Sequence, residues 1–122
     1  MPKRILIAED DEMNRRLIKD VLMYYGYEVM EAANGEEAVK LAAKHKPDLV
    51  LMDLRMPVMN GAEAIRQLKN SSETKAIKII AVTGLAMRGD RENTMKMGAD
   101  GYMAKPIDIR QLPEAIERLL IG

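Results

Sequence analysis

Side chains suited to chemistry lie at or near the ends of short apolar segments of this chain. They belong to three acids, two hydroxyl-bearing residues and one amine, namely Glu9, Asp10, Asp53, Thr83, Tyr102 and Lys105. The apolar segments alternate with helical patterns, which indicates βαβ units and a parallel sheet buried on both faces. Ligands of such sheets bind outside the carboxyl ends of the strands. We therefore expect these side chains to converge at one edge of the sheet, as a site for a metal ion and a phosphoryl group.

The acids favour a hard divalent cation. Crowded carboxylates repel one another, and one of them must hold a proton unless a cation lies between them. Mg²⁺ typically uses one or two carboxylates together with water and phosphate oxygens, so Glu9, Asp10 and Asp53 can supply its site. Mg²⁺ and Lys105 would also screen the repulsion between an attacking carboxylate and an anionic phosphoryl group.

Each of these residues also has an ordinary structural explanation. Acids at strand ends commonly cap helices or face solvent, and Asp11, which follows the acid pair, is better placed to start the first helix. Thr83 alone suits a strand, Lys105 alone suits a surface, and Tyr102 alone suits core packing with a solvated hydroxyl. Their coincidence at one edge of one sheet favours the site.

Length and composition limit the function further. A chain of 122 residues without cysteine suits one domain. The 19 basic and 19 acidic residues balance, so no overall field attracts nucleic acid or an anionic membrane. There is no signal peptide, membrane-spanning stretch or phosphate-binding glycine loop of the nucleotide-binding type. We expect a cytoplasmic protein whose partners are proteins, with no nucleic-acid or membrane partner.

The elements that position the site follow from apolar periodicity. Strands are expected at residues 4–8, 27–30, 49–52 and 79–82, with a short fifth strand around residue 102. After the first strand, apolar residues recur at helical spacing up to Gly26, namely Leu17, Ile18, Val21, Leu22 and Tyr25. Four further helices are expected: one begun by Asn34 with Glu37, one over residues 62–69 after Asn60 and Gly61, one over residues 87–97 before Gly98, and one begun by Asp108 with Gln111. This alternation predicts an α/β domain with helices on both faces of the sheet.

Four sequence blocks carry a resemblance to a known family. Residues 5–11, 51–61, 81–84 and 104–106 resemble, in this order, the receiver domain of two-component response regulators. The likeness covers essentially the whole chain, so residues 1–122 are expected to form one receiver domain. It implies a flavodoxin-like fold, a doubly wound five-stranded parallel sheet in the order 2-1-3-4-5 with five helices. That order places the first and third strands side by side, with Glu9 and Asp10 facing Asp53.

The resemblance also implies a role for each site residue. Asp53 would be the phosphoacceptor, the nucleophile that takes a phosphoryl group from a histidine. Mg²⁺ would be bound by Glu9, Asp10, Asp53 and the backbone carbonyl of Arg55, while Lys105 and the Thr83 hydroxyl would hold phosphoryl oxygens. Thr83 and Tyr102 would act as the switch that reports phosphorylation. Receiver domains usually have a cis peptide bond at the position of Lys105–Pro106, and a cis bond is expected here.

The implied partners are a sensor histidine kinase or a histidine phosphotransfer protein, and a downstream protein target. Such a protein is not a conventional enzyme, because it catalyses only its own phosphorylation and dephosphorylation. The family tunes the loss of phosphate at the positions of Arg55 and Leu85. A long cation and an apolar side chain there predict slow dephosphorylation.

Other functions remain as alternatives. A Mg²⁺-dependent phosphohydrolase that forms an aspartyl phosphate needs an acid two residues after the nucleophile, where this chain has Arg55. A receiver-like binding module that is never phosphorylated would be expected to lack the acid pair or Lys105. A receiver cut from a hybrid histidine kinase stays open, since residues 86–90 are similar both to single-domain cell-division regulators and to hybrid-kinase receivers.

Overall fold

Strands and helices alternate along the chain in the computed structural model, which describes residues 2–84 and 90–121. The strands are β1 (Arg4–Ala8), β2 (Glu28–Ala32), β3 (Leu49–Asp53), β4 (Lys78–Thr83) and β5 (Gly101–Ala104). The helices are α1 (Glu12–Tyr24), α2 (Gly35–His45), α3 (Gly61–Lys69), α4 (Asp90–Lys96) and α5 (Leu112–Ile121). All strand pairs are parallel, and the order is β2-β1-β3-β4-β5. The expected fold class and strand order are confirmed.

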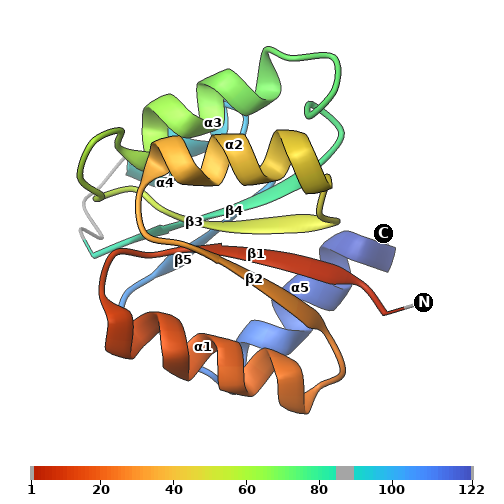
Figure 1. Ribbon diagram of the computed structural model, residues 1–122. Coiled ribbons are helices and arrows are strands. Elements are labelled where there is room, and N and C mark those ends of the chain that lie inside the picture. The colour runs from red at the N-terminus through yellow and green to blue at the C-terminus, as the bar shows by residue number, and fades with distance from the viewer. Residues whose placement is uncertain (1, 85–89, 122) are drawn as a thin grey trace.

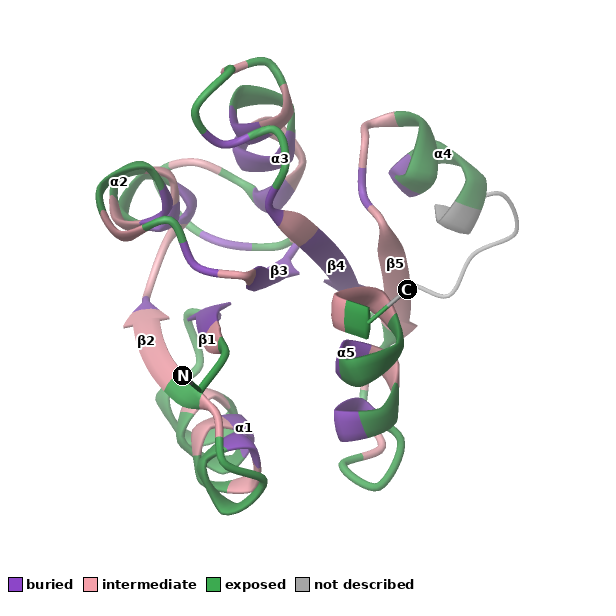
Figure 2. Ribbon diagram, turned by 90° about the vertical axis from the view of Figure 1, so that its right-hand side faces the viewer, coloured by how far each residue is buried: buried purple, intermediate pink, exposed green. Residues whose placement is uncertain are grey.

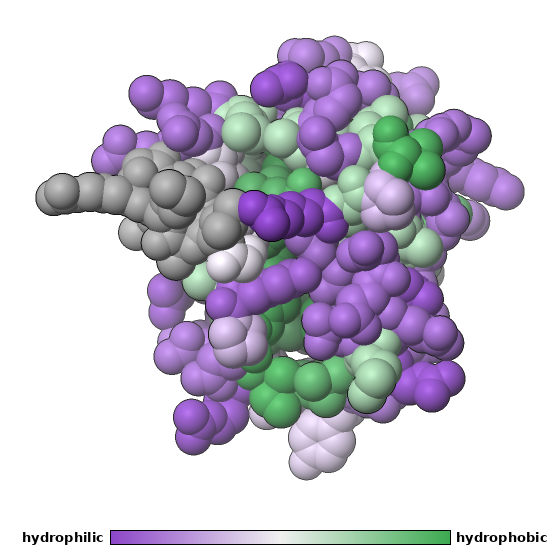
Figure 3. Space-filling view, turned by 90° about the vertical axis from the view of Figure 1, so that its left-hand side faces the viewer, coloured by the Kyte–Doolittle hydropathy of each residue, from purple (hydrophilic) through white to green (hydrophobic). Residues whose placement is uncertain are grey.

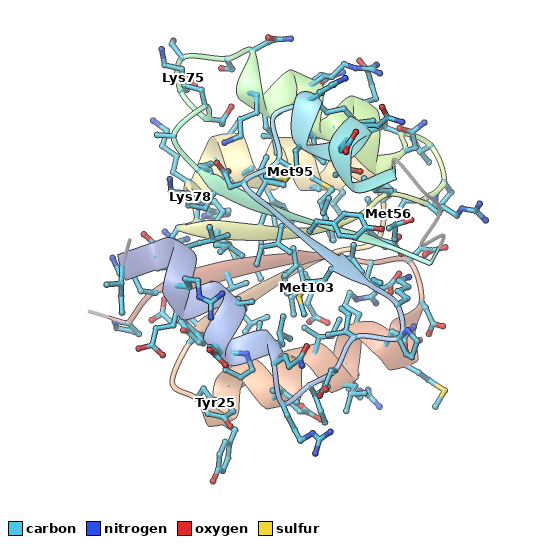
Figure 4. The ribbon with its side chains drawn as sticks, turned by 180° about the vertical axis from the view of Figure 1, so that it is seen from behind. Tyr25, Met56, Lys75, Lys78, Met95 and Met103 are labelled. Atoms are coloured by element: carbon cyan, nitrogen blue, oxygen red, sulfur yellow. The ribbon has the colours of Figure 1, made fainter. Side chains whose placement is uncertain are left out.

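The helices form two layers around the sheet. In Figure 1, α2, α3 and α4 lie on one face, and α1 and α5 lie on the other. Successive side chains of a strand point to opposite faces, so Leu6 of β1 belongs to the apolar cluster under α2 and α3, whereas Ile5 belongs to the cluster with α1 and α5. Figure 4 shows the same division, with Met56 and Met103 on opposite sides of the sheet.

The central strands are the most deeply buried elements. Every residue of β3 is buried, and β1 and β4 are buried apart from their first residues, as the concentration of purple ribbon around β3 and β4 in Figure 2 illustrates. Burying one Leu or Ile side chain stabilises the fold by about 1.5–3 kcal/mol. The sheet is therefore a rigid base for the groups at its carboxyl edge.

Three helices begin at the polar residues that the sequence indicates. Side-chain oxygens of the N-cap residues Asp11, Asn34 and Asn60 accept hydrogen bonds from backbone N–H groups in the first turns of α1, α2 and α3. Each cap stabilises a helix end by roughly 1 kcal/mol. Two of these helices follow strands that carry site acids, so the caps also fix where the chain leaves the carboxyl edge.

Several boundaries differ from the expected ones. Strand β2 runs to Ala32, two residues beyond the predicted end, because its pairing with β1 continues to the Ala8 and Ala32 pair. Helix α5 is bounded by Leu112 and Ile121, but the predicted cap at Asp108 is present: its carboxylate accepts from the N–H of Arg110 over 2.9 Å and its carbonyl oxygen accepts from the N–H of Leu112 over 3.1 Å, so a turn over residues 109–111 leads into the helix. The first residues of the predicted fourth helix, 87–89, lie outside the described residues, and α4 begins at Asp90.

The packed face of α1 is narrower than the apolar spacing suggests. Ile18 and Leu22 are buried, whereas Leu17 is 49% exposed and Tyr25 is 56% exposed. Helical residues one position apart differ by about 100° in direction, so Leu17 faces away when Ile18 faces the sheet.

Among the described residues, no helix is long and apolar enough to cross a membrane.

Candidate phosphoacceptor and metal site

The register of the sheet gathers the candidate residues at one edge. Ala8 of β1 pairs with Met52 of β3, so the residues that follow or end these strands, Glu9 and Asp53, are neighbours. Pairing then continues through β4 to β5, where Thr83 lies beside Ala104 and Lys105 follows. Figure 3 views the side of the molecule on which these strands end, with hydrophilic side chains across its middle and hydrophobic surface in a hollow beside them.

The three acids form a cluster of oxygen atoms. One carboxylate oxygen from each of Glu9, Asp10 and Asp53 lies within 4.8 Å of the others. Glu9 and Asp53 are each only 3% exposed, while Asp10 is exposed. An all-oxygen donor set of this size fits a hard divalent cation such as Mg²⁺. A metal ion held by these oxygens would be open to solvent on the side of Asp10.

Lys105 lies within ion-pair distance of both buried acids. Its Nζ lies 2.6 Å from Asp53 Oδ2 and 3.0 Å from Glu9 Oε1. The Lys105–Pro106 peptide bond is cis, as expected. Because buried carboxylates are strongly disfavoured without a counterion, one ammonium group here stabilises both of them in the metal-free protein.

Burial and charge shift two pKa values at the site. Burial, followed by hydrogen bonding to Asp53 and the charge of that carboxylate, raises the pKa of Glu9 from 4.5 to about 7, against the opposing effect of Lys105. Burial lowers the pKa of Lys105, but hydrogen bonds and charge attraction from Asp53 and Glu9 outweigh it and raise that pKa above its ordinary value. Lys105 is therefore an ammonium ion at neutral pH, and Glu9 is poised to release a proton.

The remaining candidates lie around this centre. The backbone N–H of Arg55 donates to Asp53 Oδ1 over 3.0 Å, and the Arg55 side chain is exposed. Thr83 is buried at the end of β4, where its carbonyl oxygen accepts from the N–H of Lys105 over 2.7 Å. Tyr102 is half-buried on β5 and lines a groove with residues of α5, away from the acids. Leu85 lies outside the described residues.

Sequence reasoning missed one residue and one cavity. Arg15 of α1 donates from Nη1 to the carbonyl oxygen of Glu9 over 2.8 Å and so braces the acid pair, although in the sequence it is an unremarkable helical cation. A cleft of about 320 Å³ opens beside Glu9 and Lys105 and has apolar walls from Leu17 and Ile107. The sequence gives no signal for this cleft, because periodicity assigned Leu17 to the apolar face of α1 and its exposure is a result of the fold.

Comparison with known proteins assigns the chain to a family. The sequence pattern described as "Response regulator receiver domain" matches residues 5–117. The chain is 42% identical over 120 residues to the polar-differentiation response regulator DivK of Brucella anthropi, a match that covers 98% of each protein. The DivK protein of Brucella ovis is 40% identical with the same coverage.

Solved structures agree with this assignment. The receiver domain of sensor histidine kinase PA1611 from Pseudomonas aeruginosa, which has a magnesium ion coordinated in its active-site cleft, superimposes with a TM-score of 0.92 at 34% identity over 100% of both chains. A CheY-like receiver domain protein from Methanospirillum hungatei gives a TM-score of 0.91 at 33% identity, over 99% of this chain and 95% of that one. The chain belongs to the response regulator receiver domain family, as its sequence blocks predict.

Proposed function

We propose that this receiver domain takes a phosphoryl group from a phosphohistidine onto Asp53 with the help of Mg²⁺, and passes the signal to a protein partner. The observation that supports this most directly is the arrangement around Asp53. One of its oxygens accepts from a loop N–H, the other lies 2.6 Å from the Lys105 ammonium, and two further acids stand beside it. This combination of nucleophile, cation and metal-ligating acids suits phosphoryl transfer.

The residues present fit a magnesium ion. Glu9, Asp10 and Asp53 would hold it, with the backbone carbonyl of Arg55 as a further oxygen ligand. When bound, the ion supplies positive charge that offsets the repulsion between the Asp53 carboxylate and an anionic phosphoryl group. The magnesium ion in the Pseudomonas aeruginosa receiver domain supports the proposal.

The transfer itself exchanges one bond to phosphorus for another. An Asp53 carboxylate oxygen attacks phosphorus, a P–O bond forms, and the P–N bond to the donor imidazole breaks; the electron pair stays on that nitrogen, and the ring leaves as neutral imidazole because its other nitrogen carries a proton. The Lys105 ammonium, freed from the attacking carboxylate, would turn to a phosphoryl oxygen and stabilise the charge spread over the phosphoryl group. Its raised pKa keeps it protonated for this role.

The protein would act once per phosphoryl group and release no product until water hydrolyses the acyl phosphate. Arg55 projects from the loop next to Asp53 and is exposed, a position from which a long cation can hinder an incoming water molecule. A phosphohydrolase is the less favoured alternative, because the position two residues after the nucleophile carries this cation rather than an acid. We therefore keep slow dephosphorylation as part of the proposal.

The phosphodonor would be a sensor histidine kinase or a histidine phosphotransfer protein, and the output would go to a downstream protein. The identity of 42% with a DivK regulator supports a role as a signalling regulator of that type in the cytoplasm. A receiver that belongs to a histidine kinase stays the alternative, since such a domain is 34% identical. A receiver-like module that is never phosphorylated is disfavoured by the intact set of acids and Lys105 around the candidate nucleophile.

Labelling with a small acyl phosphate in the presence of Mg²⁺ tests the proposal. We expect wild type to gain one phosphoryl group that hydroxylamine removes, and Asp53→Asn to gain none. Asp11→Asn is the matched control: it removes a neighbouring acid but keeps a good N-cap, so labelling should persist. Labelling of Asp53→Asn at the wild-type level, or a product that resists hydroxylamine, would rule out Asp53 as phosphoacceptor.

A further inference from the structure

The loop between β3 and α3, residues 54–60, touches the candidate phosphoacceptor directly. The N–H of Arg55 donates to Asp53 Oδ1 over 3.0 Å. The base of the loop is closed by the N–H of Gly61, which donates to the carbonyl oxygen of Leu54 over 3.1 Å. A change in the shape of this loop therefore moves both a donor at Asp53 and the backbone of Arg55.

The tip of the loop has a strained backbone. Val58 has a φ of 67°, in the left-handed region that β-branched residues rarely adopt. The N–H of Met59 donates to the carbonyl oxygen of Pro57 over 2.7 Å and closes a tight turn around Val58. The Val58 side chain is 77% exposed, so its burial does little to offset the strain. Such a conformation persists only when surrounding structure holds it.

Gly35, the first residue of α2, contacts the loop from outside and stabilises its shape. Its N–H donates to the carbonyl oxygen of Met59 over 3.0 Å, and Figure 1 shows the start of α2 beside this loop. A Cβ at Gly35 would overlap the carbonyl oxygen of Met59. The N-cap side chain of Asn34 bonds the N–H of Glu37 instead, so the N–H of Gly35 serves the loop. Only glycine permits this contact.

We propose that Gly35 is a positioning residue for the phosphoacceptor site. Through Met59 it holds the strained loop in the shape that keeps the Arg55 N–H on Asp53 and the Arg55 backbone near the acid cluster. The inference rests on the proposed function for the role of the metal, but the contact between the loop and α2 can be tested without metal. Gly35 follows β2 and begins α2, so it is remote in the sequence from every candidate ligand and would still act at the site.

Gly35→Ala tests the proposal in the full chain. The added methyl group must displace Met59, so in the metal-free protein we expect the Arg55 amide signal in ¹H–¹⁵N NMR spectra to move and its hydrogen exchange to accelerate. Mg²⁺ affinity, measured by titration, should fall about tenfold, the lower end of the loss seen when groups that orient metal ligands are removed. An unchanged Arg55 amide together with an unchanged Mg²⁺ affinity would overturn the proposal.

Gly26→Ala is the matched control for a merely structural effect. Gly26 follows α1 at a φ of 90°, and no atom lies within 4 Å of an added Cβ. This variant strains the backbone at the opposite edge of the sheet and leaves the loop untouched. It should lower stability while the Arg55 amide and the Mg²⁺ affinity stay as in wild type. Equal losses of Mg²⁺ affinity in both variants would show that Gly35 acts only through stability.

Wild-type protein provides a second test, which decides the matter even where Gly35→Ala does not fold. Coupling between two sites is reciprocal, so Mg²⁺ bound at the acids should slow hydrogen exchange of the Gly35 amide. The amide of Glu37, which bonds to Asn34 in the same helical turn, should not respond. Equal responses of the two amides would contradict the proposal. If wild type binds no Mg²⁺, the metal site itself is refuted. In that case the Arg55 amide signal of metal-free Gly35→Ala still decides the role of Gly35.

Discussion

At the scale of single residues, the site is an arrangement of charges around Asp53. Two nearly fully buried carboxylates share the ammonium of Lys105, and a third carboxylate faces solvent. Burial raises the pKa of Glu9 to about 7, with further contributions from the hydrogen bond to Asp53 and the charge of that carboxylate, which Lys105 offsets only in part. Binding of a divalent cation would complete the neutralisation and draw the proton from Glu9.

The raised pKa of Glu9 predicts that Mg²⁺ affinity depends on pH. The ionised form of Glu9 is the ligand, and protons compete with the metal below its pKa. Mg²⁺ affinity should therefore rise from about pH 6 and level off above about pH 8, with a proton released on binding. Titrations in buffers of different ionisation enthalpy measure both effects. In Glu9→Gln the pH dependence over this range should vanish, and its persistence would assign the proton to another group.

The same shift predicts how the stability of the metal-free protein changes with pH. Folded Glu9 holds its proton up to about pH 7, whereas in the unfolded chain it loses it near 4.5, so the folded state binds more protons between these values. The contribution of Glu9 to stability is therefore fully present below about pH 4.5 and is lost as the pH rises through about 7. Added Mg²⁺ should reverse this loss at pH 8.

At the scale of elements, the placement of the strands along the chain could be predicted, because apolar segments and polar end residues are local signals, whereas the order of the strands in the sheet followed from the resemblance to receiver domains. Most N-caps were predictable for the same reason, as Asp11, Asn34 and Asn60 show. Asp108 likewise caps the turn that leads into α5, because its carboxylate accepts from the N–H of Arg110 and its carbonyl oxygen accepts from the N–H of Leu112, but α5 itself begins only at Leu112. Local hydrogen bonding therefore predicts where a helix lies. Its first residue depends on whether the turn after the cap is helical or not.

The fine geometry of the site could not be predicted in the same way. The site acids could be predicted because they lie at the ends of predicted strands. The hydrogen bond from the N–H of Gly35 to Met59, by contrast, depends on how closely α2 approaches the β3–α3 loop. A single glycine in a helix start carries no information about such an approach. The bracing of Glu9 by Arg15 is likewise a tertiary contact.

The proposed switch of Thr83 and Tyr102 belongs to the scale of elements, because it would link β4 to the face formed by α4, β5 and α5. We expect Thr83→Ala to leave phosphorylation of Asp53 largely possible and to uncouple it from this face, since the hydroxyl that would follow the phosphoryl group is gone. Amide NMR shifts from residues 90–103, compared with and without beryllofluoride, measure the response. Equal shifts in wild type and Thr83→Ala would refute the coupling through Thr83.

At the scale of the whole molecule, the two edges of the sheet have different tasks. The carboxyl edge gathers the acids, whereas near the opposite edge Lys69 Nζ donates to Asp100 Oδ2 and to the carbonyl oxygens of Lys75 and Ile77. Asp100 Oδ2 also accepts from the N–H of Ile79 over 2.8 Å. This network ties the end of α3 to the starts of β4 and β5 and so supports the fold at a distance from the chemistry.

Because the Lys69–Asp100 network lies at a distance from the acids, we predict that stability can be lost without loss of metal binding. Lys69→Met should lower the free energy of unfolding by about 2–3 kcal/mol, because it leaves the half-buried Asp100 carboxylate without its cation. Urea denaturation measures this change. Mg²⁺ affinity of the folded variant should stay within about twofold of wild type, and a larger loss would show that the two edges are coupled.

The central claim is that Asp53 carries the phosphoryl group. The most direct test is to incubate the protein with Mg²⁺ and a phosphodonor, reduce the acyl phosphate with borohydride, and locate the reduced residue by peptide mass spectrometry. The account predicts reduction at Asp53 and at no other acid. A reduced residue at Asp10 or Glu9, or an unreduced phosphoryl group on His45, would contradict it.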